Sequence, residues 1–100
     1  MRRAAKVDAN QGDIVRALRS VGCGVLDLSA VGKGCPDLLV VWPTAPFRQE
    51  LFEVKDGAKP PSARRLTDDQ VKFHAMWKGV IHVVTSPAEA LEIVGIKGAR

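Results

Sequence analysis

Two short apolar segments, joined by a link that contains two prolines, restrict the fold of this chain most strongly. Residues 37–42 (DLLVVW) and 49–55 (QELFEVK) carry Val, Leu, Phe and Trp side chains, which suit a pleated strand. The prolines between them suit a turn and disfavour regular structure. We therefore predict an antiparallel hairpin that turns about Ala45, in which facing residues have numbers that sum to 90.

The predicted register brings charged side chains together at one end of the hairpin. Asp37 faces Glu53, and directly opposed residues have Cβ atoms roughly 4.5–5.5 Å apart. Because side chains alternate between the two faces of a strand, Lys55 shares the face of Glu53, while Val54 points the other way. The convergence depends on this pairing, since a slip of one residue would move one acid to the opposite face.

Helical and strand patterns surround the hairpin and give the order helix, three strands, helix, strand, helix. The strand after the second helix can return parallel through a right-handed crossover. This predicts an α/β fold with a mixed sheet flanked by helices. We expect helices over Gln11–Val21, from Thr67 onward and from Pro87 to Gly95, and further strands over Gly24–Leu28 and Val80–Thr85.

Capping residues mark where the helices begin. Asn10 is a suitable N-cap for the first helix, and Thr67 with Gln70 predicts a capping box at the start of the second. The second helix should bury an apolar face made of Phe73, Met76 and Trp77.

Length and composition are those of one globular domain. The chain has 100 residues, of which 46% are hydrophobic and 26% are charged. We expect one domain over residues 10–96, preceded by a basic, poorly ordered arm over residues 1–9. The two cysteines form no CxxC pair, and free thiols are the default for a cytosolic protein. The net charge of +4 favours a polyanionic partner, nucleic acid first, although a generic basic surface would give the same value.

Two carboxylates as close as Asp37 and Glu53 repel each other unless a divalent cation lies between them. Carboxylate oxygens together with water are the ligands that Mg²⁺ prefers. Lys55 beside such a site could orient an attacking water or offset transition-state charge. The alternative is a surface Glu–Lys pair with an unrelated turn aspartate. The spacing of Pro36-Asp37 from Glu53-Val54-Lys55, with apolar strands between, favours the metal site.

At these motifs the sequence resembles the PD-(D/E)xK nuclease superfamily, and within it the small stand-alone VRR-NUC (virus-type replication-repair) nucleases of phages. The resemblance covers about residues 8–95 and rests on three motifs: Gly32-x-Gly34-Cys35-Pro36-Asp37, Leu51-Phe52-Glu53-Val54-Lys55 and Leu66-Thr67-x-x-Gln70. It implies an αβββαβ core and Mg²⁺ or Mn²⁺ bound by Asp37 and Glu53 with help from the Val54 carbonyl. It also implies a catalytic lysine at Lys55.

The resemblance extends to partners and location. Relatives are often dimeric, and some cut branched DNA such as four-way junctions. A phage or prophage protein of this kind would act in the cytoplasm of the bacterial host.

Two glutamines have open roles. Many members of the superfamily carry a glutamate on the first helix that reaches the metal or its water, and here the best match is Gln11. Its amide could face a metal-bound water or simply solvent. Gln70 is explained by the capping box alone, but the resemblance also places it near the active site, and the two roles are compatible.

Basic residues flank the expected site in loops. If these residues contact phosphates, the affinity for nucleic acid should fall as the salt concentration rises. The alternative is that they are solvated loop residues with no role in binding. The candidates for nucleic-acid binding are Lys33, Lys59, Arg64 and Arg65. His74 and His82 are expected to be an exposed helix residue and a strand residue rather than ligands.

Three functions remain open from the sequence. The first is a metal-dependent endonuclease that hydrolyses phosphodiester bonds in DNA, such as Holliday junctions or flaps. The second is a basic DNA-binding module without catalysis, which the missing helix-one glutamate would favour. The third is a nuclease that cuts RNA, because no residue in the sequence identifies a reader of the 2′-hydroxyl.

Overall fold

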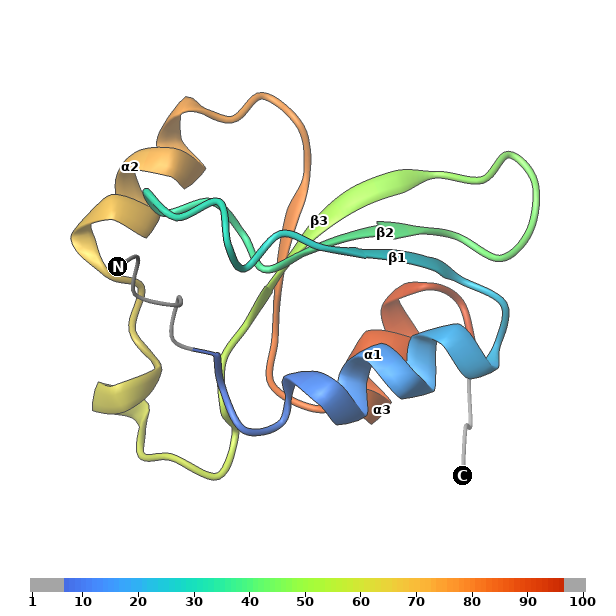
Figure 1. Cartoon of the computed structure of the whole chain (residues 1–100), viewed down its shortest axis with the longest axis horizontal. Coiled ribbons are helices and arrows are strands. Elements are labelled where there is room, and N and C mark those ends of the chain that lie inside the picture. Colours follow the sequence, from blue (N-terminus) through green and yellow to red (C-terminus); the bar gives the residue numbers. More distant parts are fainter. Residues whose placement is uncertain (1–6, 97–100) are drawn as a thin grey trace.

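The computed structural model describes residues 7–96, which form a four-stranded sheet with three α-helices and one 3₁₀ turn (Figure 1). The order of elements along the chain agrees with the prediction. The elements are α1 (Gln11–Ser20), β1 (Gly24–Asp27), β2 (Leu38–Val41), β3 (Gln49–Val54), η1 (Pro61–Arg64), α2 (Asp68–Met76), β4 (Ile81–Val84) and α3 (Pro87–Ile93). Residues 1–6 of the predicted basic arm lie outside the described residues. None of the helices in residues 7–96 is both long and apolar enough to cross a membrane.

The sheet has the order β1-β2-β3-β4 and is mixed, as expected. The first three strands are antiparallel neighbours, and β4 runs parallel to β3 after the chain has passed through α2. Within the hairpin, Leu38 pairs with Phe52, Leu39 with Leu51, and Val41 with Gln49. These are the pairs whose numbers sum to 90, so the predicted register is confirmed. The paired strand β2 begins at Leu38, one residue later than predicted.

One face of the sheet carries the hydrophobic core. Helices α1 and α3 pack against each other on this side of the sheet (Figure 1). Ile14 and Leu18 of α1 are fully buried there. The sheet contributes alternate residues of β2 and β3 together with Val84 of β4, and Ala90 of α3 and Val94 just after it complete the cluster. The buried cluster consists of Ile14, Leu18, Cys23, Leu38, Val40, Phe52, Val54, Val84, Ala90 and Val94.

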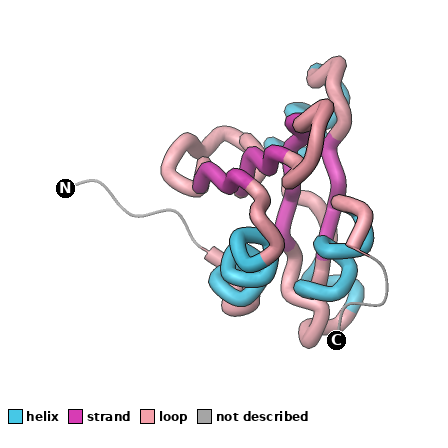
Figure 2. Tube along the Cα trace, turned by 90° about the vertical axis from the view of Figure 1, so that its right-hand side faces the viewer, coloured by secondary structure: helices cyan, strands magenta, loops and turns pink. Residues whose placement is uncertain are grey.

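Helix α2 lies apart from this core, and its side chains contact Glu53 near the end of β3, on the sheet face opposite to α1 and α3. In the side view of Figure 2, helices lie at both ends of the strands. The predicted burial of an apolar face on α2 is wrong, because no residue of the helix is buried. Met76 is 63% exposed, and Trp77 just after the helix is 43% exposed and stacks on Phe73. The helix therefore packs through its polar face.

Asn10 precedes α1 as predicted, but its side chain does not cap the helix. The amide nitrogen instead donates to the backbone carbonyls of Lys55 and Thr85, at 3.1 and 2.9 Å. These carbonyls lie just beyond the ends of the parallel strands β3 and β4. Asn10 thus fastens the start of α1 to the end of the sheet where the charged residues gather.

Candidate active site

A cavity of about 280 Å³ opens at the end of β3, between the N-terminal segment and α2. Its wall combines two acids of the predicted hairpin with basic and polar side chains from the following loop. The lining residues are Asp8, Asp37, Glu53, Val54, Lys55, Lys59, Ala63, Arg65, Thr67 and Gln70. Asp37, Glu53 and Lys55 therefore converge, as the hairpin register predicted.

Asp37 is held against the strand that carries the other two residues. It lies one residue before β2, and its Oδ2 accepts a hydrogen bond from the backbone N–H of Val54 at 2.7 Å. Its own carbonyl accepts from the N–H of Leu28, which ties the residue to the chain after β1. Both contacts fix the direction of the side chain, so the carboxylate points into the cavity beside Glu53.

Glu53 is almost completely buried, with 1% of its surface exposed. Burial, followed by the hydrogen bond and the charge of Asp37, raises the pKa of Glu53 to about 9, and the nearby ammonium of Lys55 only partly opposes this. At neutral pH the pair of acids therefore retains a proton. A divalent cation between them could replace that proton, because it would balance both negative charges.

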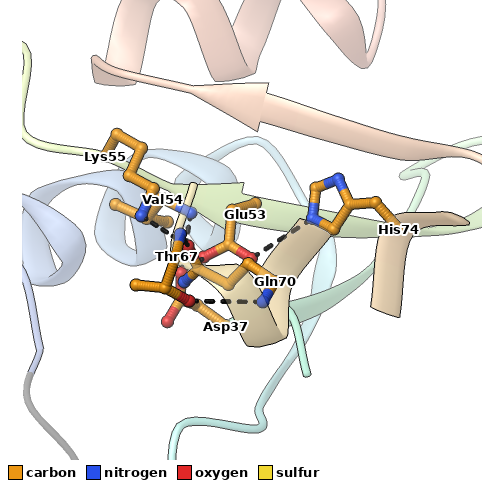
Figure 3. Close-up of polar contacts among 7 residues, drawn as sticks. All are labelled: Asp37, Glu53, Val54, Lys55, Thr67, Gln70 and His74. Atoms are coloured by element: carbon orange, nitrogen blue, oxygen red, sulfur yellow. Dashed lines mark hydrogen bonds and ion pairs between the residues drawn. The ribbon is translucent and has the colours of Figure 1, made fainter. Parts of the chain in front are cut away.

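Gln70 connects the acid to the lysine. Its Oε1 accepts from the Lys55 ammonium at 2.8 Å and from the backbone N–H of Thr67 at 2.9 Å, and its Nε2 donates to Oε2 of Glu53 at 3.1 Å (Figure 3). Because the Lys55 ammonium and the Thr67 N–H are both donors, the atom of Gln70 that faces them must be the oxygen, and this fixes the orientation of the amide. The Gln70 side chain therefore closes the capping box and contacts the site at the same time, so both predicted roles are present together.

The N-terminus of α2 is positioned by two local features. The Thr67 hydroxyl accepts from the Gln70 N–H at 3.2 Å, which completes the capping box. The loop between β1 and β2 then approaches the first turn of α2 at Gly34. A Cβ at this position would lie 2.2 Å from the Asp69 carbonyl oxygen, and the residue has φ +79°. Only glycine allows this approach, which brings Gln70 within reach of Glu53.

No family model matches the sequence, and no curated protein matches it. A solved structure described as a VRR_NUC domain is similar over 87% of this chain and 96% of its own, with a TM-score of 0.60 and 23% sequence identity. The chain has the fold of a VRR_NUC domain. The sequence motifs and the arrangement of elements thus point to the same fold, reached by independent observations.

The sequence motifs led us to expect a divalent cation between Asp37 and Glu53, and the donor set around these two residues is compatible with one. Two adjacent acids, one of them fully buried and holding a proton, suit a small hard cation. Within residues 7–96, however, no three His, Cys, Asp or Glu side chains are arranged as a metal cage. Mg²⁺ commonly binds through one or two carboxylates and completes its shell with water and substrate phosphate, which fits an open cavity.

The four basic residues expected to contact nucleic acid divide into two pairs. Lys59 and Arg65 line the cavity, whereas Lys33 and Arg64 do not. Lys33 lies in the loop next to Gly34 and is exposed, and Arg64 lies in η1. The cavity of this VRR_NUC fold therefore has two cationic side chains at hand for a phosphate, in addition to the buried Lys55.

Gln11 has partners other than the two that the sequence left open, a metal-bound water and solvent. Its side chain is buried, so it does not face solvent, and the amide nitrogen donates to Ser29 Oγ at 3.0 Å and to Asp27 Oδ2 at 3.4 Å. The residue is not among those that line the cavity. The Gln11 amide therefore joins α1 to the end of β1 and the segment after it, and the geometry gives it no contact with the two acids.

Two residues that the sequence did not single out are part of the site. Asp8 lines the cavity, forms an ion pair with Lys59 at 3.6 Å and adds a small contribution to the raised pKa of Glu53. The expectation that His74 is an exposed helix residue is wrong, because its side chain is only 19% exposed and contacts Glu53 directly. The spacing of His74 from Gln70, four residues along a helix, is the sequence signal that could have indicated a shared face.

Proposed function

We propose that this protein is a Mg²⁺- or Mn²⁺-dependent endonuclease that hydrolyses phosphodiester bonds in DNA, branched DNA such as four-way junctions and flaps included. The observation that carries the proposal is the placement of Asp37, Glu53 and Lys55 in the wall of one cavity. The fold likeness to a VRR_NUC domain supports it. A protein that only binds DNA gains nothing from acids that face the phosphates.

The cation would be held by Asp37 and Glu53, with the carbonyl of Val54 as a further oxygen. Bound there, it would lower the pKa of a coordinated water and offset charge on a phosphoryl oxygen. Glu53 has to release its proton before it can act as a ligand, so metal affinity should rise with pH. The hydrogen bond from the Val54 N–H keeps Asp37 in place while this exchange occurs.

Lys55 is the residue that would act on the water or the phosphate. Its side chain is largely buried, and one of its three N–H groups is used by Gln70. The remaining donors of the ammonium can hold an attacking water or a non-bridging phosphate oxygen. The contact with Gln70 fixes the ammonium in advance, so little reorganisation is needed when charge develops.

Lys59 and Arg65 would receive the DNA backbone at the cavity, in keeping with the net charge of +4. Phosphate contacts make binding dependent on salt. Replacing Arg65 by alanine should lower the slope of log affinity against log salt by about 1, as measured by fluorescence anisotropy on a four-way junction. The exposed Lys72 on α2, outside the cavity, provides a control as Lys72→Ala.

A homodimer would present two such sites to a branched substrate, and the sheet offers a surface for it. Leu26 pairs with Leu39, and Val83 pairs with Glu53, so all four lie on the sheet face opposite to α1 and α3. Leu26 is 56% exposed and Val83 is 45% exposed. Exposed apolar side chains on a sheet face are typical of a contact with another protein, and we propose a second copy of this chain related by a two-fold axis.

Sedimentation equilibrium tests the dimer. The wild type should be dimeric at micromolar concentration, and Leu26→Glu and Val83→Glu should be monomeric. Phe47→Glu, at the tip of the hairpin and equally exposed at 55%, should remain dimeric. A wild type that sediments only as a monomer, with and without DNA, would exclude the dimer.

Cleavage assays test the enzymatic proposal. Four-way junction, flap and linear duplex DNA are incubated with the protein and Mg²⁺ or Mn²⁺, with EDTA controls and a matching single-stranded RNA. We expect cleavage of at least one DNA substrate that EDTA and Lys55→Ala abolish and that Lys72→Ala retains. DNA binding without cleavage, unchanged by metal or by Lys55→Ala, would instead identify a non-catalytic binding module. Cleavage of the RNA alone would identify a ribonuclease.

A further inference from the structure

His74 lies one helical turn after Gln70 on α2 and contacts the same glutamate. Its Nε2 is 3.5 Å from Oε1 of Glu53, and the imidazole is 19% exposed (Figure 3). Residues four apart on a helix lie on the same face, so both side chains approach Glu53 from α2. The polar face of α2 thus packs on one buried carboxyl group.

The two oxygens of Glu53 have different partners on this helix. Gln70 donates to Oε2 at 3.1 Å, and His74 lies against Oε1. The orientation of the Gln70 amide is determined by Thr67 and Lys55, so this side chain can serve only one of the oxygens. A carboxylate held at a single oxygen can still rotate about its terminal bond. A second contact at the other oxygen removes that freedom.

We propose that His74 is a positioning residue for the cation site. An N–H at its Nε2 donates to Oε1 of Glu53 and, together with Gln70, sets the plane of the carboxylate toward Asp37. The inference rests on the cation site proposed above between Asp37 and Glu53. Hydrogen bonds that orient metal-binding carboxylates raise metal affinity by about 10- to 100-fold. The distance of 3.5 Å is long for such a bond, and catalytic hydrogen bonds commonly shorten when the site is filled.

The amides of glutamine and asparagine separate this role from bulk and polarity. The side-chain nitrogen of glutamine reaches about as far from the backbone as Nε2 of histidine, whereas that of asparagine reaches only as far as Nδ1. Because the contact is made by Nε2, His74→Gln should retain it and His74→Asn should lose it. Both variants keep a polar residue at a partly exposed helix position, so their folding should be alike.

His82 offers a matched control elsewhere in the fold. Its Nε2 lies 2.6 Å from Oε1 of Glu50, so it is also a histidine paired with a glutamate. Its ring packs against Phe52 at 5.1 Å, on the core face of the sheet. His82 is not among the residues that line the cavity. His82→Asn should therefore leave metal binding unchanged.

The experiment measures Mn²⁺ binding to the full-length protein without DNA, by titration calorimetry and by the loss of the free-ion EPR signal. We expect His74→Ala and His74→Asn to raise the Kd for Mn²⁺ by about 10-fold, and His74→Gln to stay within about 3-fold of wild type. Circular dichroism confirms that each variant is folded. If His74→Ala does not fold, the comparison of the glutamine and asparagine variants decides.

Equal Mn²⁺ affinity of wild type and His74→Asn would overturn the role of His74 and leave the cation site intact. A His74→Gln variant that binds Mn²⁺ as weakly as His74→Asn would overturn it too. A nitrogen of His74 coupled directly to bound Mn²⁺ in pulsed EPR would make the residue a ligand, which also contradicts a positioning role. Absence of Mn²⁺ binding in the wild type would remove the proposed function together with this inference, and is thereby distinguished from the other outcomes.

Discussion

Asp37 and Val54 are 17 residues apart in the sequence, yet a hydrogen bond of 2.7 Å joins the carboxylate of the first to the backbone N–H of the second. This contact fastens the residue before β2 to the last residue of β3. It also leaves Asp37 beside Glu53, the immediate neighbour of Val54 in the chain. The backbone therefore holds the two acids adjacent, and the proton that Glu53 retains at neutral pH avoids the repulsion of two negative charges.

Asp37→Asn and Asp37→Ala should separate the structural role of this residue from its role as a ligand. The asparagine Oδ1 can still accept from the Val54 N–H, so the free energy of unfolding should change little. Alanine leaves a buried donor unpaired, which costs about 1–3 kcal/mol. Both variants should lose Mn²⁺ binding and cleavage. Urea denaturation beside calorimetry checks this, and an asparagine variant with full Mn²⁺ affinity would exclude Asp37 as a ligand.

Glu53 should make the metal-free protein less stable as the pH rises. Burial and the adjacent Asp37 raise the pKa of Glu53 from 4.5 to about 9. Between these values the folded state holds a proton that the unfolded chain has released. The free energy of unfolding should therefore fall with pH, by up to about 1.4 kcal/mol per pH unit from this group.

Glu53→Gln removes that proton exchange, so this variant should show a flatter dependence of stability on pH. It should also be more stable than wild type at pH 8 in EDTA. The exposed Glu92→Gln on α3 serves as the control and should follow the wild type. Urea denaturation from pH 5 to pH 9 measures the slopes, and parallel curves for wild type and Glu53→Gln would contradict the raised pKa.

Gln70 should affect activity more than stability. Gln70→Ala removes the contacts to Glu53 and Lys55 and one half of the capping box, so we expect at least about a 10-fold loss of cleavage rate. Ser86→Ala removes a cap from α3, where the hydroxyl accepts from the Glu89 N–H, and Ser86 does not line the cavity. It should cost about 1 kcal/mol of stability and retain activity. Equal cleavage rates for Gln70→Ala and Ser86→Ala would mean that Gln70 acts only as a helix cap.

Gly34 should be much less tolerant of a side chain than Gly32, although both have positive φ. A Cβ on Gly32 meets no atom within 4 Å, so Gly32→Ala should cost only the strain of its conformation, about 1–2 kcal/mol. A Cβ on Gly34 would lie 2.2 Å from the Asp69 carbonyl, which forces the loop and α2 apart. We expect Gly34→Ala to lose at least as much stability as Gly32→Ala and also most of its activity. Thermal unfolding and cleavage measured on both variants provide the check.

The sequence by itself determined the hairpin and what it brings together. Strand register depends on the alternation of side chains and on the length of the turn, and both can be read locally. This was enough to place Asp37, Glu53 and Lys55 on one face. The capping box of Thr67 and Gln70 is likewise a local pattern, and it begins the helix where predicted.

Only the tertiary structure decided which other side chains reach the two acids. His74 lies 21 residues from Glu53 in the sequence. The exposed residues of α2 include both charged Lys72 and apolar Val71 and Met76, so the hydrophobic pattern did not indicate which face of the helix would pack. The positions of Asp8 and Gln11 follow from their neighbour Asn10, whose amide joins the start of α1 to the carbonyls of Lys55 and Thr85. Such contacts join segments that are distant in sequence. Their geometry follows from how whole elements pack, which no local pattern of residues encodes.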